Sequence, residues 1–112
     1  MSPDEAFEQL MNGHQRFLTG RQQSNFTLET ATSNTQVQGQ NPLASVLTCS
    51  DSRAIPAFIF DMSFGEIFVV KTAGAIATET QIASLEFAVA QLNVPLIVVM
   101  GHTMCEIGRA HV

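Results

Sequence analysis

The fold is decided by residues 44–53, which read ASVLTCSDSR. The apolar run over residues 44–48 predicts a buried strand, which leads directly into Cys49 and a polar turn that contains Asp51 and Arg53. Strands without polar alternation are typical of a parallel sheet that is covered on both faces. This stretch therefore predicts an α/β core, with reactive side chains at the carboxyl end of its first strand.

Two further apolar runs, over residues 67–70 and 96–100, predict two more strands. Between them a capping box, Thr78 with Gln81, predicts the start of a helix. The apolar face expected of that helix consists of Ile82, Leu85, Val89 and Leu92. Strand, helix and strand in alternation indicate a parallel, right-handed βαβ arrangement.

The chain before residue 42 has a different character. A capping box over residues 2–5, with Pro3 at the first helical position, predicts a helix that ends at Gly20. Residues 21–41 are rich in Gln, Asn, Thr and Ser, and they predict a long polar connection. A connection of that length in a small domain usually has a purpose, such as wrapping a neighbouring chain.

Composition excludes several classes of protein. The 112 residues are 46% hydrophobic and 13% charged, which is incompatible with a disordered tail, and the net charge of −5 disfavours a nucleic-acid partner. Apolar runs are shorter than the ~18 residues of a membrane span, and no secretory signal pattern is present, so we expect no membrane association and a cytoplasmic location. The two cysteines are then expected to stay reduced.

Three metal-ligating side chains follow two of the predicted strands. Cys49 follows the first strand, while His102 and Cys105 follow the third. The carboxyl ends of parallel strands line one crevice, so these side chains can converge although they are far apart in sequence. Two thiolates and an imidazole suit Zn²⁺, and three protein ligands leave open the fourth position that a catalytic site needs.

Asp51 and Arg53 lie on the turn directly after the first of these ligands. The carboxylate of Asp51 could accept a hydrogen bond from metal-bound water while the guanidinium of Arg53 holds it in place. Alternatively, Asp51 could occupy the fourth position itself and close the site. Arg53 would decide between the two states, since it can hold Asp51 away from the metal.

Residues 49–53 together with His102-x-x-Cys105 resemble the signature of the β-class carbonic anhydrases. The resemblance extends to residues 10–20, to residues 40–42 and to the Ala-Gly pair at residues 73–74, so it covers nearly the whole chain. It implies a parallel β-sheet core with flanking helices and an amino-terminal helix and arm, and it implies that the carboxyl-terminal part of the family fold is missing. We expect a single domain over residues 1–112, with a helical arm and polar connection over 1–41 and a βαβ zinc-binding core over 42–112.

The resemblance also implies a function: zinc-dependent, reversible hydration of carbon dioxide to bicarbonate by a zinc-bound hydroxide. Cys49, His102 and Cys105 would hold the zinc, Asp51 would orient the hydroxide and Arg53 would orient Asp51. Gln40 stands where the family has a substrate-binding glutamine that acts across a dimer interface. Family members are dimers or larger assemblies, so the resemblance implies a homodimer or higher homo-oligomer.

The sequence departs from the family pattern at several positions. Glu106 replaces the usual glycine, Lys71 and Thr72 stand where Arg-Asn is common, and Ala75 replaces an asparagine. The changes at Lys71, Thr72 and Ala75 are expected to weaken hydrogen bonds around the site, and the acidic Glu106 would oppose formation of a metal-bound hydroxide. Because the chain is also shorter than family members, the alternative is a catalytically impaired zinc-binding remnant or interaction module. A related linear substrate, such as carbonyl sulfide, is a further alternative.

Overall fold

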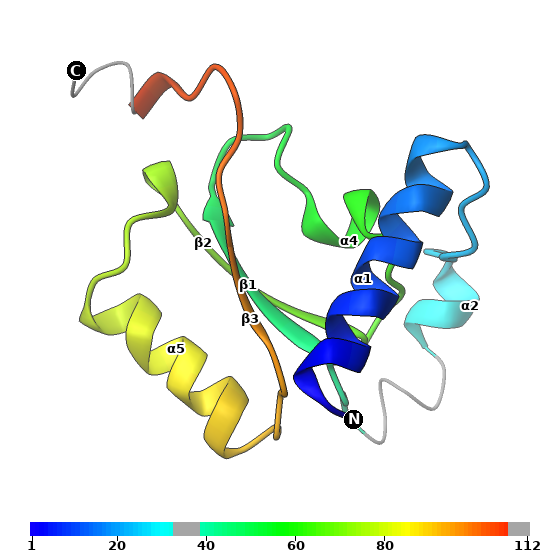
Figure 1. Cartoon of the computed structure of the whole chain (residues 1–112), viewed down its shortest axis with the longest axis horizontal. Coiled ribbons are helices and arrows are strands. Elements are labelled where there is room, and N and C mark those ends of the chain that lie inside the picture. The colour runs from blue at the N-terminus through cyan, green and yellow to red at the C-terminus, as the bar shows by residue number, and fades with distance from the viewer. Residues whose placement is uncertain (33–38, 108–112) are drawn as a thin grey trace.

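The structure, a computed structural model, describes residues 1–32 and 39–107 (Figure 1). Part of the predicted polar connection (33–38) and the last residues of the predicted core (108–112) lie outside the described residues. The helices and strands are α1 (Pro3–Leu18), α2 (Leu28–Ala31), β1 (Ala44–Cys49), α4 (Pro56–Ile59), β2 (Ile67–Thr72), a 3-10 turn (Ala73–Ala75), α5 (Glu79–Ala90) and β3 (Ile97–Met100).

The three strands form one parallel sheet in the order β2-β1-β3. Cys49 at the end of β1 pairs with Thr72 at the end of β2, and Thr48 pairs with Met100 at the end of β3. All three strands therefore end at the same edge, which confirms the predicted parallel arrangement. α5 lies on one face of the sheet, and α1 with α4 lies on the other (Figure 1).

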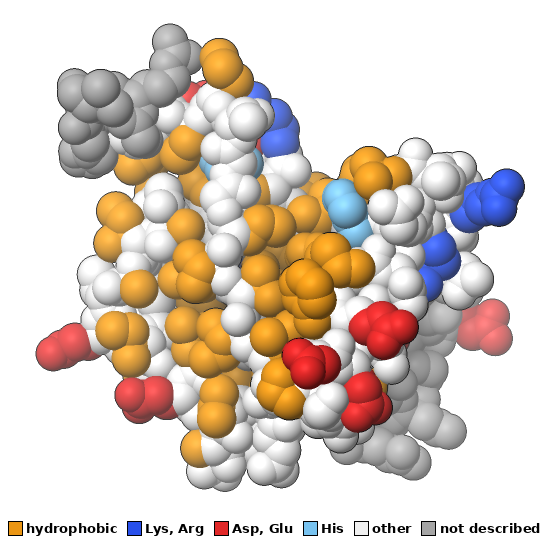
Figure 2. Space-filling model, in the orientation of Figure 1, with side chains coloured by type: hydrophobic (Ala, Val, Ile, Leu, Met, Phe, Trp, Pro, Cys, Tyr) orange, Lys and Arg blue, Asp and Glu red, His pale blue; other side chains and the backbone are white. Residues whose placement is uncertain are grey.

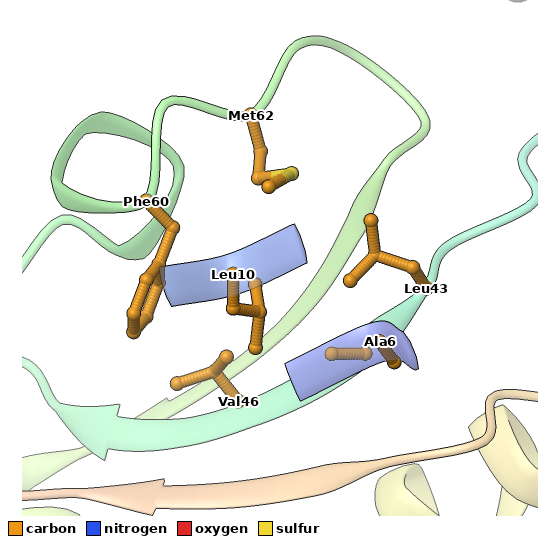
Figure 3. Close-up of a cluster of buried hydrophobic side chains, with 7 residues drawn as sticks. Ala6, Leu10, Leu43, Val46, Phe60 and Met62 are labelled. Carbon is orange, nitrogen blue, oxygen red and sulfur yellow. The ribbon is translucent and has the colours of Figure 1, made fainter. Parts of the chain in front are cut away.

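The core lies between α1 and β1. Ala6 and Leu10 of α1 are fully buried and belong to one apolar cluster with Val46 of β1 and with Phe60 and Met62 after α4 (Figure 3). Full burial of a leucine such as Leu10 contributes about 2 kcal/mol to stability. This cluster fixes α1 against the sheet and leaves the carboxyl edge of the sheet free for the site.

α1 begins as the sequence predicts. The N–H of Glu5 donates to Ser2 Oγ over 3.1 Å, and the N–H of Ser2 donates to Glu5 Oε1 over 3.3 Å. The chain leaves the helix at Gly20, whose φ of 70° favours glycine. Both terminal signals of this helix are therefore confirmed.

The first part of the polar connection folds back on its own chain. The carboxylate of Asp61, which is fully buried, accepts hydrogen bonds from Arg16 Nε (2.5 Å) and from the N–H groups of Gln23 (2.9 Å) and Ser24 (2.9 Å). A ring contact between Phe26 and Phe64 adds to this packing. One buried carboxylate thus joins α1, the connection and the turn after α4.

α5 packs differently from the sequence prediction. Only Ala88 is buried in this helix, whereas Ile82 and Val89 of the expected apolar face are 46% and 45% exposed. The reason is that α5 packs against β2 and β1 and leaves β3 uncovered on this side.

The predicted burial of both sheet faces holds for β1 but not for β3. Ile97 and Val99 of β3 are 44% and 69% exposed, and β1 is buried along its whole length. Hydrophobic side chains accordingly gather across the middle of the surface in Figure 2. Within the described residues, no helix combines the length and the hydropathy that crossing a bilayer requires.

Candidate metal centre

The three predicted ligands meet at the carboxyl edge of the sheet. One donor atom from each of Cys49, His102 and Cys105 lies within 4.8 Å of the other two. Cys49 is the last residue of β1, and the other two lie on the loop that follows β3. Because β1 and β3 are neighbours in a parallel sheet, their ends bring these residues together, and the predicted convergence is confirmed.

The chemistry of this cluster fits a zinc ion. His102 Nδ1 lies 2.8 Å from the carbonyl oxygen of Thr103, so this nitrogen carries the proton and donates it. His102 Nε2 is buried and has no hydrogen-bond partner among the described residues. A buried ring nitrogen with a free lone pair beside two thiol sulfurs is the donor set that zinc prefers.

The surroundings of the Cys49 sulfur stabilise its thiolate form. Hydrogen bonds from the backbone N–H groups of Asp51 and Gly74 lower the pKa of Cys49 to about 7. The Gly74 nitrogen lies 3.2 Å from the sulfur. Backbone donors therefore favour a charged sulfur near neutral pH.

Asp51 lies beside the cluster and is held by Arg53. Its Oδ1 accepts from Arg53 Nε (2.9 Å) and from the Arg53 backbone N–H (2.8 Å), and its Oδ2 accepts from Arg53 Nη2 (2.6 Å). These bonds hold the pKa of Asp51 well below its usual range. Asp51 Oδ2 also lies 3.8 Å from His102 Nε2. The carboxylate is thus ionised next to the donor atoms but turned toward the guanidinium.

Arg53 also joins the two loops of the site. Its Nη2 donates to the carbonyl oxygen of Met104 over 3.3 Å. Met104 has a φ of 57°, which turns the chain sharply just before Cys105. One guanidinium therefore connects the loop after β1 with the loop after β3.

Two open cavities flank the cluster and share Cys49, Cys105 and Ile107. The larger, of about 340 Å³, is mostly apolar and is lined also by Ala75 and Ile76. The smaller, of about 230 Å³, reaches Asp51 and Glu106. The ligand atoms of Cys49 and Cys105 therefore border a mostly apolar cavity on one side and a cavity with acidic side chains on the other.

The departures from the family pattern carry hydrogen bonds of their own. Lys71 Nζ donates to the carbonyl oxygen of Ala54 (2.7 Å), and Thr72 Oγ1 donates to that of Ile76 (2.7 Å). These bonds brace the loop after β1 and the turn after β2. The expectation that hydrogen bonds here are weaker than in the family stays a prediction.

Gln40 is not brought to the cluster by the fold of one chain. It is exposed and precedes β1, and the next residue, Asn41, donates its N–H to Gly65 O over 3.2 Å. Cys49 ends the same strand, so Gln40 and the cluster lie toward opposite ends of β1. Sequence reasoning also gave no role to the Gly74 amide, because a backbone donor leaves no side-chain signal.

Comparison with known proteins gives one consistent result. The family described as carbonic anhydrase matches residues 44–112. Carbonic anhydrase 2 of Mycobacterium tuberculosis is 40% identical over 104 residues, which are 93% of this chain and 50% of that protein.

Solved structures agree. The β-carbonic anhydrase CcaA aligns with a TM-score of 0.68 and 29% identity over 93% of this chain and 52% of that one. A tetrameric β-carbonic anhydrase of Sordaria macrospora aligns with a TM-score of 0.66 and 31% identity over 71% of this chain and 42% of that one. The chain thus spans about half the length of the relatives that it matches.

Proposed function

Because this chain belongs to the β-class carbonic anhydrase family, we propose that it catalyses the zinc-dependent, reversible hydration of carbon dioxide to bicarbonate. One observation carries the proposal: the donor atoms of Cys49, His102 and Cys105 lie within 4.8 Å of one another, beside an Asp51 carboxylate that Arg53 holds. This arrangement offers ligands for a metal and, separately, a fixed acceptor next to it.

The proposed ligands are the two cysteine sulfurs and His102 Nε2. Two thiolates and a neutral imidazole carry a charge of −2, which neutralises a divalent cation. Zinc bound there supplies a Lewis acid that lets water act as a nucleophile near neutral pH. The Nδ1 proton of His102, donated to Thr103 O, keeps the ring in the tautomer that presents Nε2.

We assign Asp51 the role of orienting the attacking nucleophile. Since its pKa lies well below the usual range, the carboxylate is ionised and can only accept a hydrogen bond. Arg53 holds both carboxylate oxygens, which supports the open state of the site over the state in which Asp51 occupies the fourth position. Arg53 is thus the residue that positions Asp51.

Carbon dioxide is small and apolar, which suits the cavity lined by Ala75, Ile76 and Ile107. We keep Gln40 as a substrate-binding residue, supplied to the cluster by a second chain, since it lies far along β1 from the cluster of its own chain. The proposal therefore includes a homodimer or higher homo-oligomer. A reducing compartment such as the cytoplasm would keep both thiols available to the metal.

The test is the rate of carbon dioxide hydration by the purified, zinc-loaded chain, followed by stopped flow with a pH indicator. We expect a rate well above that of an equal concentration of free zinc. Asp51→Ala should retain zinc and lose at least about 100-fold in rate, as expected for loss of a positioned catalytic group. Full activity of Asp51→Ala would contradict the role of this residue.

The second candidate function is a zinc-binding interaction module without turnover. It is favoured by the apolar surface over β3, where Val99 is 69% exposed. A zinc-loaded chain whose hydration rate is no better than that of free zinc would favour this candidate over the enzyme.

A further inference from the structure

We propose that Gly74 is a positioning residue of the metal centre: its backbone N–H holds the Cys49 sulfur, and its missing Cβ leaves the space in which the segment that carries Cys105 closes on the site. The proposal rests on the metal site proposed above. It assigns a role to a residue that offers no side chain to the metal.

The fold places the Gly74 amide over the Cys49 sulfur. β1 and β2 stay paired to their last residues, Cys49 and Thr72, and the N–H of Ser50 donates to Thr72 O over 2.9 Å. The 3-10 turn Ala73–Ala75 follows at once, and the Gly74 nitrogen comes within 3.2 Å of Cys49 Sγ. The strand register thus aims this donor at the sulfur.

The backbone at this position favours glycine. Gly74 has a φ of 71°, in the left-handed region, where a side chain adds strain. The N–H of Gly74 belongs to the peptide plane that joins Ala73 to Gly74 and reaches Cys49 from within this turn. If a residue with a side chain relaxes out of the left-handed region, the turn has to shift, and the peptide plane that carries the N–H shifts with it.

Space gives a second and independent reason for glycine. A Cβ at position 74 would lie 2.9 Å from Ile107 Cγ2 and 3.3 Å from Ile107 Cβ. Ile107 follows Cys105 by one intervening residue and lines both cavities beside the cluster. A side chain at position 74 would therefore push the Cys105 segment away from Cys49.

The hydrogen bond from the Gly74 N–H orients the Cys49 sulfur and stabilises the negative charge of its thiolate form. Hydrogen-bond partners of metal ligands typically account for about 10- to 100-fold in metal affinity. We therefore expect that losing this bond weakens zinc binding and changes the electronic character of the metal–sulfur bond. Neither effect depends on turnover.

The first test compares Gly74→Ala with Gly20→Ala in the full chain. Gly20 has a φ of 70° but lies after α1, away from the cluster, and a Cβ at this position would have nothing within 4 Å. Zinc affinity is measured by competition with a chromophoric chelator, and the cobalt-substituted chain is examined for its sulfur-to-cobalt absorption band. We expect Gly74→Ala to lose about tenfold or more in zinc affinity and to shift the band, and Gly20→Ala to change neither.

Combining Gly74→Ala with Ile107→Ala distinguishes the steric effect of a side chain at position 74 from the loss of the hydrogen bond to Cys49. Shortening the Ile107 side chain to Cβ should restore part of the lost affinity, because the 2.9 Å contact with Ile107 Cγ2 disappears while the left-handed strain remains. Zinc affinity within about twofold of the original chain in Gly74→Ala, with an unchanged cobalt band, would overturn the proposal.

A second variant removes the donor alone and covers the case in which Gly74→Ala does not fold. The full chain can be assembled from synthetic peptides joined at Cys49 and Cys105, with the peptide bond between residues 73 and 74 replaced by an ester. The ester keeps the glycine shape and lacks the N–H. A loss of about tenfold in zinc affinity together with a shifted cobalt band supports the proposal, and unchanged values overturn it.

The readouts separate this proposal from the proposed function. A chain that binds zinc but does not hydrate carbon dioxide would refute the enzyme and leave the role of Gly74 standing if the variants lose affinity. Equal zinc affinity of all variants would refute only the role of Gly74. Failure of the original chain to bind zinc at all would overturn both.

Discussion

The Arg53 guanidinium donates hydrogen bonds to both carboxylate oxygens of Asp51, with Nε 2.9 Å from Oδ1 and Nη2 2.6 Å from Oδ2. This fork geometry is available to arginine and not to lysine, whose ammonium is a point charge. The same Nη2 reaches Met104 O on the loop after β3. Orientation of Asp51 and attachment of the two loops therefore depend on one side chain.

Arg53→Lys should lower the hydration rate by about 10- to 100-fold while zinc remains bound, because Asp51 keeps a positive neighbour but loses its fixed orientation. Stopped-flow rates and zinc content of the same preparation check this. Arg21→Lys, which changes an exposed arginine on the connection, is the control and should leave the rate unchanged. A wild-type rate in Arg53→Lys would refute the positioning role.

Asp61→Asn should lower the free energy of unfolding by about 3 kcal/mol, because it leaves Arg16 facing an uncharged group in a buried site. Urea denaturation of the zinc-free chain measures the change. Glu8→Gln removes a charge from an exposed position of α1 and should shift stability by less than about 0.5 kcal/mol. Equal free energies of unfolding for the two variants would contradict the role of Asp61 in holding the polar connection against α1.

The pH dependence of stability should also reveal Asp61. Burial alone would raise its pKa, but the hydrogen bonds from Arg16, Gln23 and Ser24 outweigh burial and hold the pKa well below its usual range. The pKa of Asp61 in the folded chain is thus lower than its value of about 3.9 in the unfolded chain. Ionised Asp61 therefore stabilises the fold fully at pH values above about 3.9, and this stabilisation is lost as the pH falls through the folded-state pKa. The stability gap between the original chain and Asp61→Asn should narrow in acid, and a gap that stays constant between neutral pH and strong acid would contradict this.

Gly13→Ala should destabilise the chain by more than about 2 kcal/mol, even though alanine favours helices. A Cβ at Gly13 would lie 1.8 Å from the Phe60 carbonyl oxygen, so α1 could not keep its contact with the end of α4. Asn12→Ala, at an exposed neighbouring position, should be neutral or slightly stabilising. Thermal melting by circular dichroism distinguishes the two, and a stable Gly13→Ala chain would show that α1 packs less closely.

Sequence reasoning anticipated those features that local patterns encode. The strand positions, both ends of α1 and the convergence of Cys49 with His102 and Cys105 follow from apolar runs, capping residues and the shared edge of parallel strands. The packing of α5 could not be predicted, since the spacing of Ile82 and Val89 shows that they share one face of a helix but not which strands lie under that face.

Neither the Gly74 donor at the site nor the buried Asp61 acceptor away from it could be predicted from residue types. The Gly74 amide and the Asp61 joint depend on backbone directions and on contacts between distant segments, which a single sequence does not record. Asp61 in particular lies in a turn after α4 with a φ of 51°, and only the folded chain shows that its carboxylate is fully buried.

The most direct test of the central claim is X-ray absorption spectroscopy at the zinc edge of the full chain, together with its zinc content. We predict about one zinc per chain, bound by two sulfur atoms at ~2.3 Å and by lighter nitrogen or oxygen atoms at ~2.0 Å, with one sulfur lost in Cys105→Ser. A folded chain that binds no zinc, or binds zinc without sulfur, would contradict the account.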